Sequence, residues 1–271
     1  MFDRRIGIIG CGNMGEALLR GILSRPLLPR EDIIGSEKKI SRRDYISQKF
    51  KIKMADSAAE VLASSDMIIL AVKPQNIAEL LRELTADLGS GHLLVSIAAG
   101  ISTAQIEKGI GKKISVIRAM PNSPILVNQA ITALAYGQYV NDNDKVAARA
   151  MFSALGEIVE VKEDLMDVVT AISGSGPAYF MLIIEYLTKI GVNFGLDRKV
   201  AYKLASQTAL GSARMLVETA GAPDALRKKV TSPGGTTEAA LDVFKKMNLE
   251  QIYTDAVKAA IERSKKVSGG H

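Results

Sequence analysis

From residue 5 to about residue 161, short apolar runs alternate with longer segments in which apolar residues recur at helical spacing. The short runs are rich in β-branched residues and are predicted to be strands; they cover residues 6–9, 33–35, 67–72, 93–97, 114–117, 131–134 and 158–161. The runs at 67–72 and 93–97 are apolar throughout, as expected of strands that are covered on both faces. Because helices separate the strands, the pattern predicts a Rossmann-type α/β domain with a mostly parallel sheet.

Polar residues at the starts of the helical segments support this alternation. Ser41, Ser57, Ser102 and Asn141 each precede a helical pattern, and Ser and Asn are favoured N-cap residues. Ser57 is followed three residues later by Glu60, which is the spacing of a capping box. We therefore expect a helix to begin after each of these caps.

After about residue 161 the strand pattern stops, and helices are predicted over residues 177–194, 198–218, 223–230, 237–247 and 250–267. One helical face is rich in apolar and small residues, namely Leu182, Ile183, Tyr186, Leu187, Ile190, Ala201, Leu204, Ala205, Thr208 and Ala209. Because a helical domain of about 110 residues has limited capacity for its own core, we predict that this face is an oligomer interface. The predicted domains are residues 1–162 and an all-helical part over residues 163–271, whose last residues, 268–271, are predicted to be disordered.

Composition narrows the function classes. The chain has 271 residues and a net charge of +6, but Lys and Arg are scattered among Asp and Glu, there is no Trp, and aromatic residues make up 5%. We therefore expect a small-molecule substrate rather than nucleic acid. The single cysteine, Cys11, excludes an internal disulfide, and two histidines are too few for a metal-ligand cluster, so we expect no metal.

Neither export nor membrane insertion is expected. The early basic and apolar segment is interrupted by glycines, Asn13 and Glu16, unlike a signal peptide. The most apolar helical pattern, residues 177–190, contains Glu185 and Lys189 and is shorter than the roughly 20 residues that span a bilayer. These observations favour a cytoplasmic protein.

The strongest local motif runs from Gly10 to Gly15, between a predicted strand and a helix predicted over residues 16–23. In the phosphate-binding turn of dinucleotide-binding folds, the first glycine permits a tight turn, the second lets the backbone approach the pyrophosphate, and the third brings helix and strand close. The alternative is a glycine-rich turn without a ligand. The predicted cofactor contacts here are Ile9, Gly10, Cys11, Gly12, Asn13, Met14 and Gly15.

Residues after the second predicted strand bear on the choice between NADP and NAD. Ser36 and the cations Lys38, Lys39, Arg42 and Arg43 suit a 2′-phosphate, whereas Glu37 suits a ribose hydroxyl. The alternative for the cations is a solvated helix face. We predict NADPH as the cofactor, with Ser36 and Lys38 among its contacts and NADH as the alternative.

Further cofactor contacts are expected at the carboxyl ends of other predicted strands, where ligands of open α/β sheets bind. They are Ala71, Val72, Lys73 and Pro74 after one strand, Ala98 and Ala99 after the next, and Asn122 after a third. Small side chains at Ala98 and Ala99 leave room for a nicotinamide. For the side chain of Lys73, a plain helix start before Pro74 is the alternative.

Four more segments, 71–75 (AVKPQ), 118–122 (RAMPN), 173–179 (SGSGPAY) and 231–237 (TSPGGTT), accompany the turn at 10–15. In this order, and over nearly the whole chain, they resemble the pyrroline-5-carboxylate reductases. The resemblance implies the NAD(P)H-dependent reduction of L-1-pyrroline-5-carboxylate to L-proline, the last step of proline biosynthesis. It also implies a homodimer interlocked through C-terminal helices, in which the Thr237 loop of one subunit faces the cofactor of the other, and further assembly into a decamer.

The segment at 231–237 carries the predicted substrate site. Its glycines expose backbone N–H groups before a helix predicted over residues 238–246, which makes a pocket suited to a carboxylate. The alternative is a helix N-cap by Thr236 or Thr237. The resemblance favours substrate contacts at Ser232, Gly234, Gly235, Thr236 and Thr237, with Glu163 lining the pocket. It makes Thr237 the catalytic residue, which would donate a hydrogen bond to the ring nitrogen.

Two other functions are alternatives to this one. A β-hydroxyacid dehydrogenase needs a lysine four residues beyond a glycine-rich segment, but that position is Phe180, and no Lys or Arg occurs from residue 163 to 188. A non-catalytic NADP-sensing regulator would not need the intact segment at 233–237. The chain departs from the family pattern at Ala58 and Lys229, which bear on the cofactor preference and not on the reacting centre.

Overall fold

The computed structural model describes residues 3–25 and 27–268. The chain divides into two compact units, Met1–Ser175 with Ala260–His271 and Gly176–Ala259. The predicted functional boundary after residue 162 stays a prediction, because compactness divides the chain within a continuous helical stretch. Disorder was predicted for residues 268–271, but Ser268 is the last residue of a helix, and residues 269–271 lie outside the described residues.

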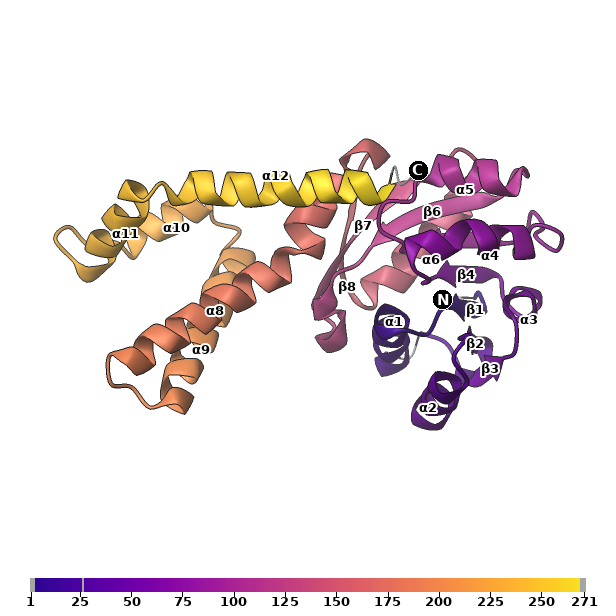
Figure 1. Ribbon diagram of the computed structural model, residues 1–271, viewed down its shortest axis with the longest axis horizontal. Helices are drawn as coiled ribbons and strands as arrows, with labels where there is room; N and C mark the ends of the chain where they lie inside the picture. The colour runs from indigo at the N-terminus through magenta and orange to yellow at the C-terminus, as the bar shows by residue number, and fades with distance from the viewer. Residues whose placement is uncertain (1–2, 26, 269–271) are drawn as a thin grey trace. The chain divides into compact units, whose positions relative to one another are not determined.

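The first unit contains an eight-stranded sheet of order β3-β2-β1-β4-β5-β6-β7-β8 (Figure 1). The strands are β1 Ile6–Ile9, β2 Ile33–Ser36, β3 Lys53–Ala55, β4 Met67–Leu70, β5 Leu93–Ser96, β6 Ser115–Met120, β7 Ala130–Tyr136 and β8 Gly156–Glu160. Every strand pair of this sheet is parallel except β6 with β7, which confirms the mostly parallel sheet. The antiparallel pair follows from its short link, which holds only the 3₁₀ helix Ser123–Val127 and no crossover helix.

Two differences from the predicted strands have local causes. The strand β3 was not predicted, because three residues with only Ala55 buried give no recognisable apolar run. The strand predicted to reach Val72 ends at Leu70, because the chain turns there toward the 3₁₀ helix Pro74–Asn76.

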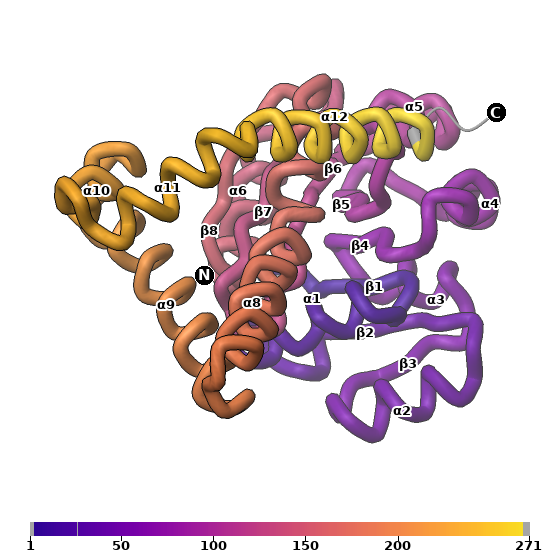
Figure 2. The backbone as a smooth tube through the Cα atoms, turned by 60° about the vertical axis from the view of Figure 1, so that its left-hand side comes forward, coloured from indigo at the N-terminus to yellow at the C-terminus, as the bar shows by residue number. Residues whose placement is uncertain are grey.

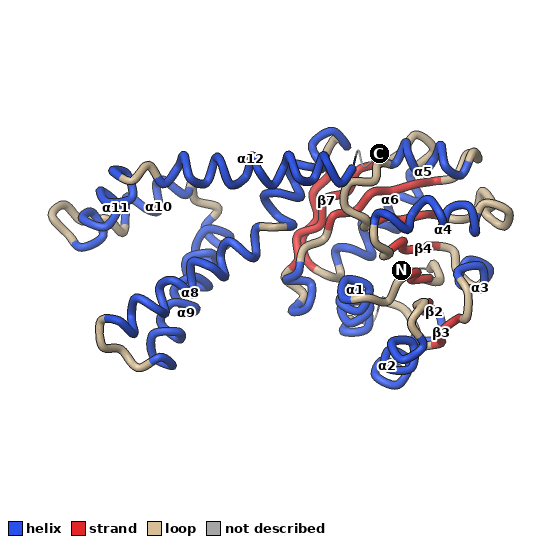
Figure 3. The backbone as a smooth tube through the Cα atoms, in the orientation of Figure 1, coloured by secondary structure: helices blue, strands red, loops and turns tan. Residues whose placement is uncertain are grey.

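Helices cover both faces of this sheet (Figure 3). They are α1 Asn13–Ser24, α2 Ile40–Phe50, α3 Ala58–Ala63, α4 Ile77–Leu84, α5 Thr103–Ile110 and α6 Asp142–Ser153. Side chains of β4 alternate between the two sides: Met67 and Ile69 pack in a cluster with residues of α1, α2 and α6, while Ile68 and Leu70 pack with α3, α4 and α5. The uniformly apolar strands are therefore buried on both faces, as predicted.

The predicted helix caps are mostly confirmed. The side chains of Ser57, Ser102 and Asn141 each accept a hydrogen bond from a backbone N–H in the first turn of the helix that follows. The prediction for Ser41 is wrong, because α2 begins at Ile40 and Ser41 lies inside its first turn. The reciprocal half of a capping box at Ser57 is also missing, since the Glu60 carboxylate accepts from the N–H of Asp56 instead.

Asp144 in the first turn of α6 links this helix to β6 and to the residues before β1. It is 4% exposed, forms a 2.6 Å ion pair with Arg4, and accepts hydrogen bonds from Asn141 Nδ2 and Ser115 Oγ. We expect Asp144→Asn to lower the free energy of unfolding by about 2 kcal/mol, because it removes the charged acceptor of a buried network. Urea unfolding measures this. The control Asp142→Asn on the same helix, where the carboxylate is 93% exposed, should change stability much less.

The second unit is helical (Figure 3), with α8 Gly176–Asn193, α9 Arg198–Thr219, α10 Pro223–Lys229, α11 Thr236–Lys246 and the first part of α12 Leu249–Ser268. Helices α8 and α9 lie side by side (Figure 1, Figure 2), and small residues allow this approach: a Cβ at Gly191 would lie 3.0 Å from that of Ala201. Ala201 and Ala205 are buried between them. Most of the rest of the predicted interface face is exposed in the single chain, including Leu187 and Ile190.

One helical stretch, Glu163–Asn193, is 31 residues long and apolar enough to cross a membrane by length and composition alone. The expectation that the apolar helix would be shorter than a membrane span was therefore wrong, because α7 Met166–Val169 and a π-helical turn at Thr170–Gly174 continue into α8. A single helix of this kind is weak evidence of a membrane protein, since helices that pack against protein meet the same measure.

Candidate functional site

The turn at residues 10–15 joins β1 to α1 and has the geometry that a pyrophosphate needs. Gly10 has a φ of +97°, which is strained for any residue with a Cβ. A Cβ at Gly15 would lie closer than 3.0 Å to the carbonyl oxygen of Gly10, so only glycine lets the helix pass the turn. At Gly12 a Cβ would meet nothing within 4 Å, and the space beside this backbone is open.

The helix after this turn begins earlier than predicted, at Asn13 instead of residue 16. Asn13, Met14 and Gly15 thus form its first turn, where backbone N–H groups have no partner within the helix. The N–H groups of Gly10 and Cys11 are already used, since both donate to the carbonyl oxygen of Ser36 at 2.9 and 3.2 Å. The donors left for an anion are therefore those at the start of α1.

Cys11 contributes packing to this turn. Its side chain is fully buried, and burial raises the pKa of the thiol to about 12. The thiol is therefore neutral and unreactive at ordinary pH. A contact of its backbone with a cofactor stays a prediction.

Arg42 on α2 donates hydrogen bonds to the backbone of the turn at residues 10–15. Its Nε donates to the carbonyl oxygen of Cys11 at 2.9 Å and its Nη2 to that of Gly12 at 3.2 Å, while Nη2 also pairs with Glu16 at 2.5 Å. Partial burial raises the pKa of Glu16, but hydrogen bonds from Lys49 and Arg42 outweigh it and lower this pKa to about 2. The guanidinium of Arg42 is thus already bonded to the turn and to Glu16. Arg43 pairs with Asp56 at 2.7 Å.

A cavity of about 530 Å³ opens beside the turn. Eight of the predicted cofactor residues line it: Ile9, Gly10, Gly12, Ser36, Lys38, Ala71, Val72 and Lys73. Its other lining residues include Glu37, Asp56, Ala58, Gln75, Glu79 and Glu83. Sequence reasoning missed Glu79 and Glu83, because two acids on an exposed helix face carry no motif. The predicted contacts Cys11, Asn13, Met14, Gly15, Pro74, Ala98, Ala99 and Asn122 are not among the residues that line this cavity.

The residues predicted near the nicotinamide lie at the ends of β5 and β6. Ala98 is buried, and Asn122 is 8% exposed. The Asn122 amide already has two partners: Oδ1 accepts from the N–H of Ile131 at 3.1 Å, and Nδ2 donates to Ser173 Oγ at 3.3 Å. The structure therefore shows Asn122 joining β7 to the π-helical turn, and its contact with a cofactor stays a prediction.

Glu163 lies within the first unit and is tied to the start of α5. Its carboxylate accepts hydrogen bonds from the N–H and the hydroxyl of Thr103, at 2.7 and 2.5 Å. Arg118 on β6 lies 3.8 Å from it and is 5% exposed, and its Nε and Nη2 have no partner among the described residues. Burial lowers the pKa of Arg118, whereas the charge of Glu163 raises it. The predicted contact of Glu163 with substrate stays a prediction.

In the second unit, the turn at residues 232–235 leads directly into α11. The alternative of a threonine cap is not what the structure shows, because α11 begins at Thr236 and its N-cap is Gly235. Gly234 has a φ of +68°, and its N–H donates to the carboxylate of Glu238 at 2.7 Å. This turn therefore already binds a carboxylate of the chain, while Thr236 and Thr237 are exposed.

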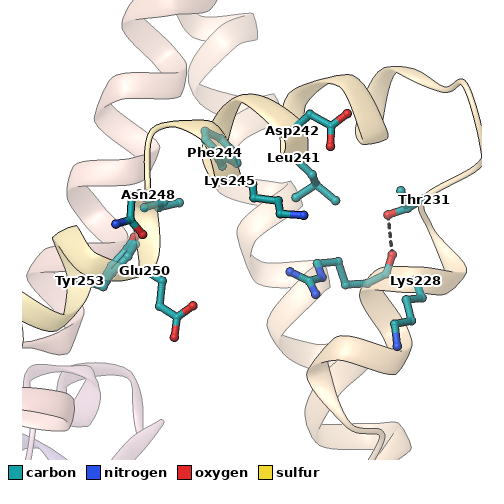
Figure 4. Close-up of a pocket in the computed structure, with 11 residues that line it drawn as sticks. Lys228, Thr231, Leu241, Asp242, Phe244, Lys245, Asn248, Glu250 and Tyr253 are labelled. Carbon is teal, nitrogen blue, oxygen red and sulfur yellow. Dashed lines mark hydrogen bonds between the residues drawn. The ribbon is translucent and has the colours of Figure 1, made fainter.

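A second cavity, of about 680 Å³, lies between α10, α11 and the start of α12 (Figure 4). The side chain of Lys245 extends into it from α11, and Thr231 Oγ1 donates to the carbonyl oxygen of Arg227 at 2.7 Å. No predicted site residue lines this cavity, although Thr231 directly precedes Ser232. The 530 Å³ cavity is thus the one that gathers predicted residues.

Two family models match the chain. The model described as pyrroline-5-carboxylate reductase dimerisation matches residues 163–267, and the model described as NADP oxidoreductase coenzyme F420-dependent matches residues 5–100. Among curated relatives, pyrroline-5-carboxylate reductase of Synechocystis sp. is 42% identical over 97% of this chain and 98% of its own length. The Escherichia coli enzyme of the same name is 37% identical over 98% of this chain and 99% of its own.

Solved structures agree with the sequence matches. A pyrroline-5-carboxylate reductase from Coxiella burnetii has a TM-score of 0.90 at 34% identity and covers 98% of both chains. Plasmodium falciparum pyrroline carboxylate reductase with NADP bound has a TM-score of 0.89 at 32% identity, covering 99% of this chain and 100% of its own. Prephenate dehydrogenase from A. aeolicus, at 13% identity and a TM-score of 0.56, shares the fold alone.

Proposed function

The chain belongs to the pyrroline-5-carboxylate reductase family, and we propose a division of labour in which residues 10–15 hold the cofactor and residues 232–237 hold the substrate. The reaction is the NADP-dependent reduction of L-1-pyrroline-5-carboxylate to L-proline, the step that completes proline biosynthesis. The observation that carries the proposal is the open glycine turn beside a cavity lined by predicted cofactor residues. Oxidation of NADPH on addition of pyrroline-5-carboxylate, followed by absorbance, tests the activity, with a β-hydroxyacid as the contrasting substrate.

The first unit fits a dinucleotide. The open space at Gly12 and the N–H groups that begin α1 suit a pyrophosphate, and Ser36 and Lys38 at the end of β2 suit the adenosine ribose. We place the nicotinamide near the small residues Ala98 and Ala99. When bound, the cofactor supplies a hydride.

The second unit supplies the substrate contacts in this proposal. The N–H of Gly234 donates to the Glu238 carboxylate in the single chain, and in this proposal it donates to the carboxylate of the substrate instead. The hydroxyl of Thr237 then orients the ring nitrogen and relays its proton. A protonated cyclic imine is already electrophilic, so orientation is the main task of these residues.

The match to a dimerisation model over residues 163–267 supports a homo-oligomer. We propose that it is a dimer in which the Thr237 loop of one subunit faces the cofactor of the other, with further assembly into a decamer. The exposed apolar side chains of α8 support burial against a second copy. We propose a cytoplasmic location, which suits a chain with one buried cysteine.

We expect Thr237→Val to reduce kcat by about tenfold to a hundredfold, because the variant loses one positioned hydroxyl that takes part in proton relay. The KM for NADPH should stay near that of the wild type. Steady-state kinetics with pyrroline-5-carboxylate measures both constants. The control is Thr231→Val, whose hydroxyl bonds only to the Arg227 carbonyl oxygen among the described residues. Full activity in Thr237→Val would remove this residue from the mechanism.

A further inference from the structure

We propose that Glu79 sets the preference between NADPH and NADH by competing with the 2′-phosphate of NADPH for Lys38. The proposal rests on the proposed function, in which the adenosine ribose lies at the carboxyl end of β2. It gives a selectivity role to an acid on α4 that belongs to no recognised motif of the chain.

The competing contact is an ion pair at the wall of the cofactor cavity. Lys38 follows β2 and Glu79 lies in the first turn of α4, and Lys38 Nζ is 3.0 Å from Glu79 Oε1. Both residues line the cavity of about 530 Å³. The two side chains are 80% and 62% exposed, so the pair can open when a ligand offers Lys38 a better partner.

The two neighbouring arginines are less available than Lys38, and Lys39 is not among the residues that line the cavity. Arg42 is bonded to the turn carbonyls and Glu16, and Arg43 is paired with Asp56. The cavity lining holds four acids against two lysines, namely Glu37, Asp56, Glu79 and Glu83 against Lys38 and Lys73. A 2′-phosphate, which carries up to two negative charges, therefore depends strongly on the state of Lys38.

NADPH and NADH affect the ion pair between Lys38 and Glu79 differently. NADPH must draw Lys38 away from Glu79, and the freed carboxylate then lies near the phosphate and repels it. NADH carries a hydroxyl at the same position, so the pair can stay closed while Glu37 accepts the hydroxyl hydrogen. Glu79 therefore weakens the binding of NADPH and leaves that of NADH nearly unchanged.

The test is calorimetric titration of the full-length protein with NADP⁺ and with NAD⁺, which measures binding without turnover. We expect Glu79→Gln to raise the ratio of NADP⁺ to NAD⁺ affinity about three- to fivefold, with a smaller gain in high salt. Lys38→Met should lower that ratio. In the Lys38→Met background, Glu79→Gln should raise the ratio less than in the wild type, because it removes only the repulsion by the carboxylate and no longer its competition for Lys38.

The matched control is Glu83→Gln. Glu83 lies one turn later on α4, lines the same cavity, and has no ion pair among the described residues. Its replacement removes the same charge and should change the ratio less than about twofold. An equal effect of Glu83→Gln, or an unchanged ratio in Glu79→Gln, would overturn the role of Glu79. Failure of the wild type to bind either nucleotide would instead overturn the proposed function.

Discussion

Gly15→Ala is expected to abolish measurable binding of NADPH. A Cβ at this position would lie closer than 3.0 Å to the carbonyl oxygen of Gly10, which is backbone and cannot move aside as a flexible side chain would. Either α1 withdraws from β1 or the turn opens, and both displace the N–H groups of Asn13 and Met14, which we propose bind the pyrophosphate. Because such groups act only when well placed, a shift near 1 Å should raise the Kd at least about a hundredfold. Calorimetric titration with NADPH measures the change.

Gly12→Ala separates the loss of the ligand site from damage to the fold. A Cβ there meets nothing within 4 Å of the protein, so the thermal unfolding midpoint should match that of the wild type. The methyl group would nevertheless occupy the space that the pyrophosphate needs, and the affinity should fall. Gly15→Ala should lower the midpoint as well. Wild-type affinity for NADPH in both variants would show that the phosphate lies elsewhere.

The sequence predicted most of the sheet because its signals are local. The strands β1, β4 and β5 are short apolar runs between helices, and their burial on both faces removes the polar alternation. The strand β3 was not predicted, because it has only three residues, one of them exposed, and is defined by its pairing with β2. The antiparallel direction of β7 was not predicted either, since it depends on a link between β6 and β7 that is too short for a crossover helix.

The candidate site could be predicted from the sequence where a single segment of the chain forms it. The glycines at residues 10–15 act through backbone shape, which a motif records. By contrast, Arg42 and Glu79 contact partners that lie about 26 and 41 residues away in the sequence, so the tertiary fold decides those contacts. The hydrogen-bond partners of Asn122 and Glu163 likewise lie in distant segments of the chain. A motif therefore identifies these residues but does not predict their partners.

The second prediction with a large expected effect concerns the exposed face of α8. Phe180 is 66% and Leu187 is 50% exposed, and these residues lie two turns apart on one side of the helix. We expect the double variant Phe180→Asp with Leu187→Asp to be monomeric, because paired carboxylates cannot be buried against a second copy without a large desolvation cost. It should bind NADP⁺ normally, since the cofactor cavity lies in the first unit, and lose turnover at least about a hundredfold. Sedimentation velocity, calorimetry and kinetics measure the three properties. A monomer with full activity would contradict the shared site.

Loss of turnover in a monomer has two explanations, and subunit mixing separates them. If each site combines the cofactor turn of one subunit with the Thr237 loop of the other, a heterodimer of Gly15→Ala and Thr237→Val subunits contains one site with both defects and one intact site. The isolated heterodimer then keeps about half of the wild-type activity, well above either parent. If each site lies within one subunit, every site in the heterodimer carries one defect and mixing restores nothing. Co-expression with two purification tags isolates the heterodimer, and its kcat distinguishes a shared site from a dimer needed only for stability.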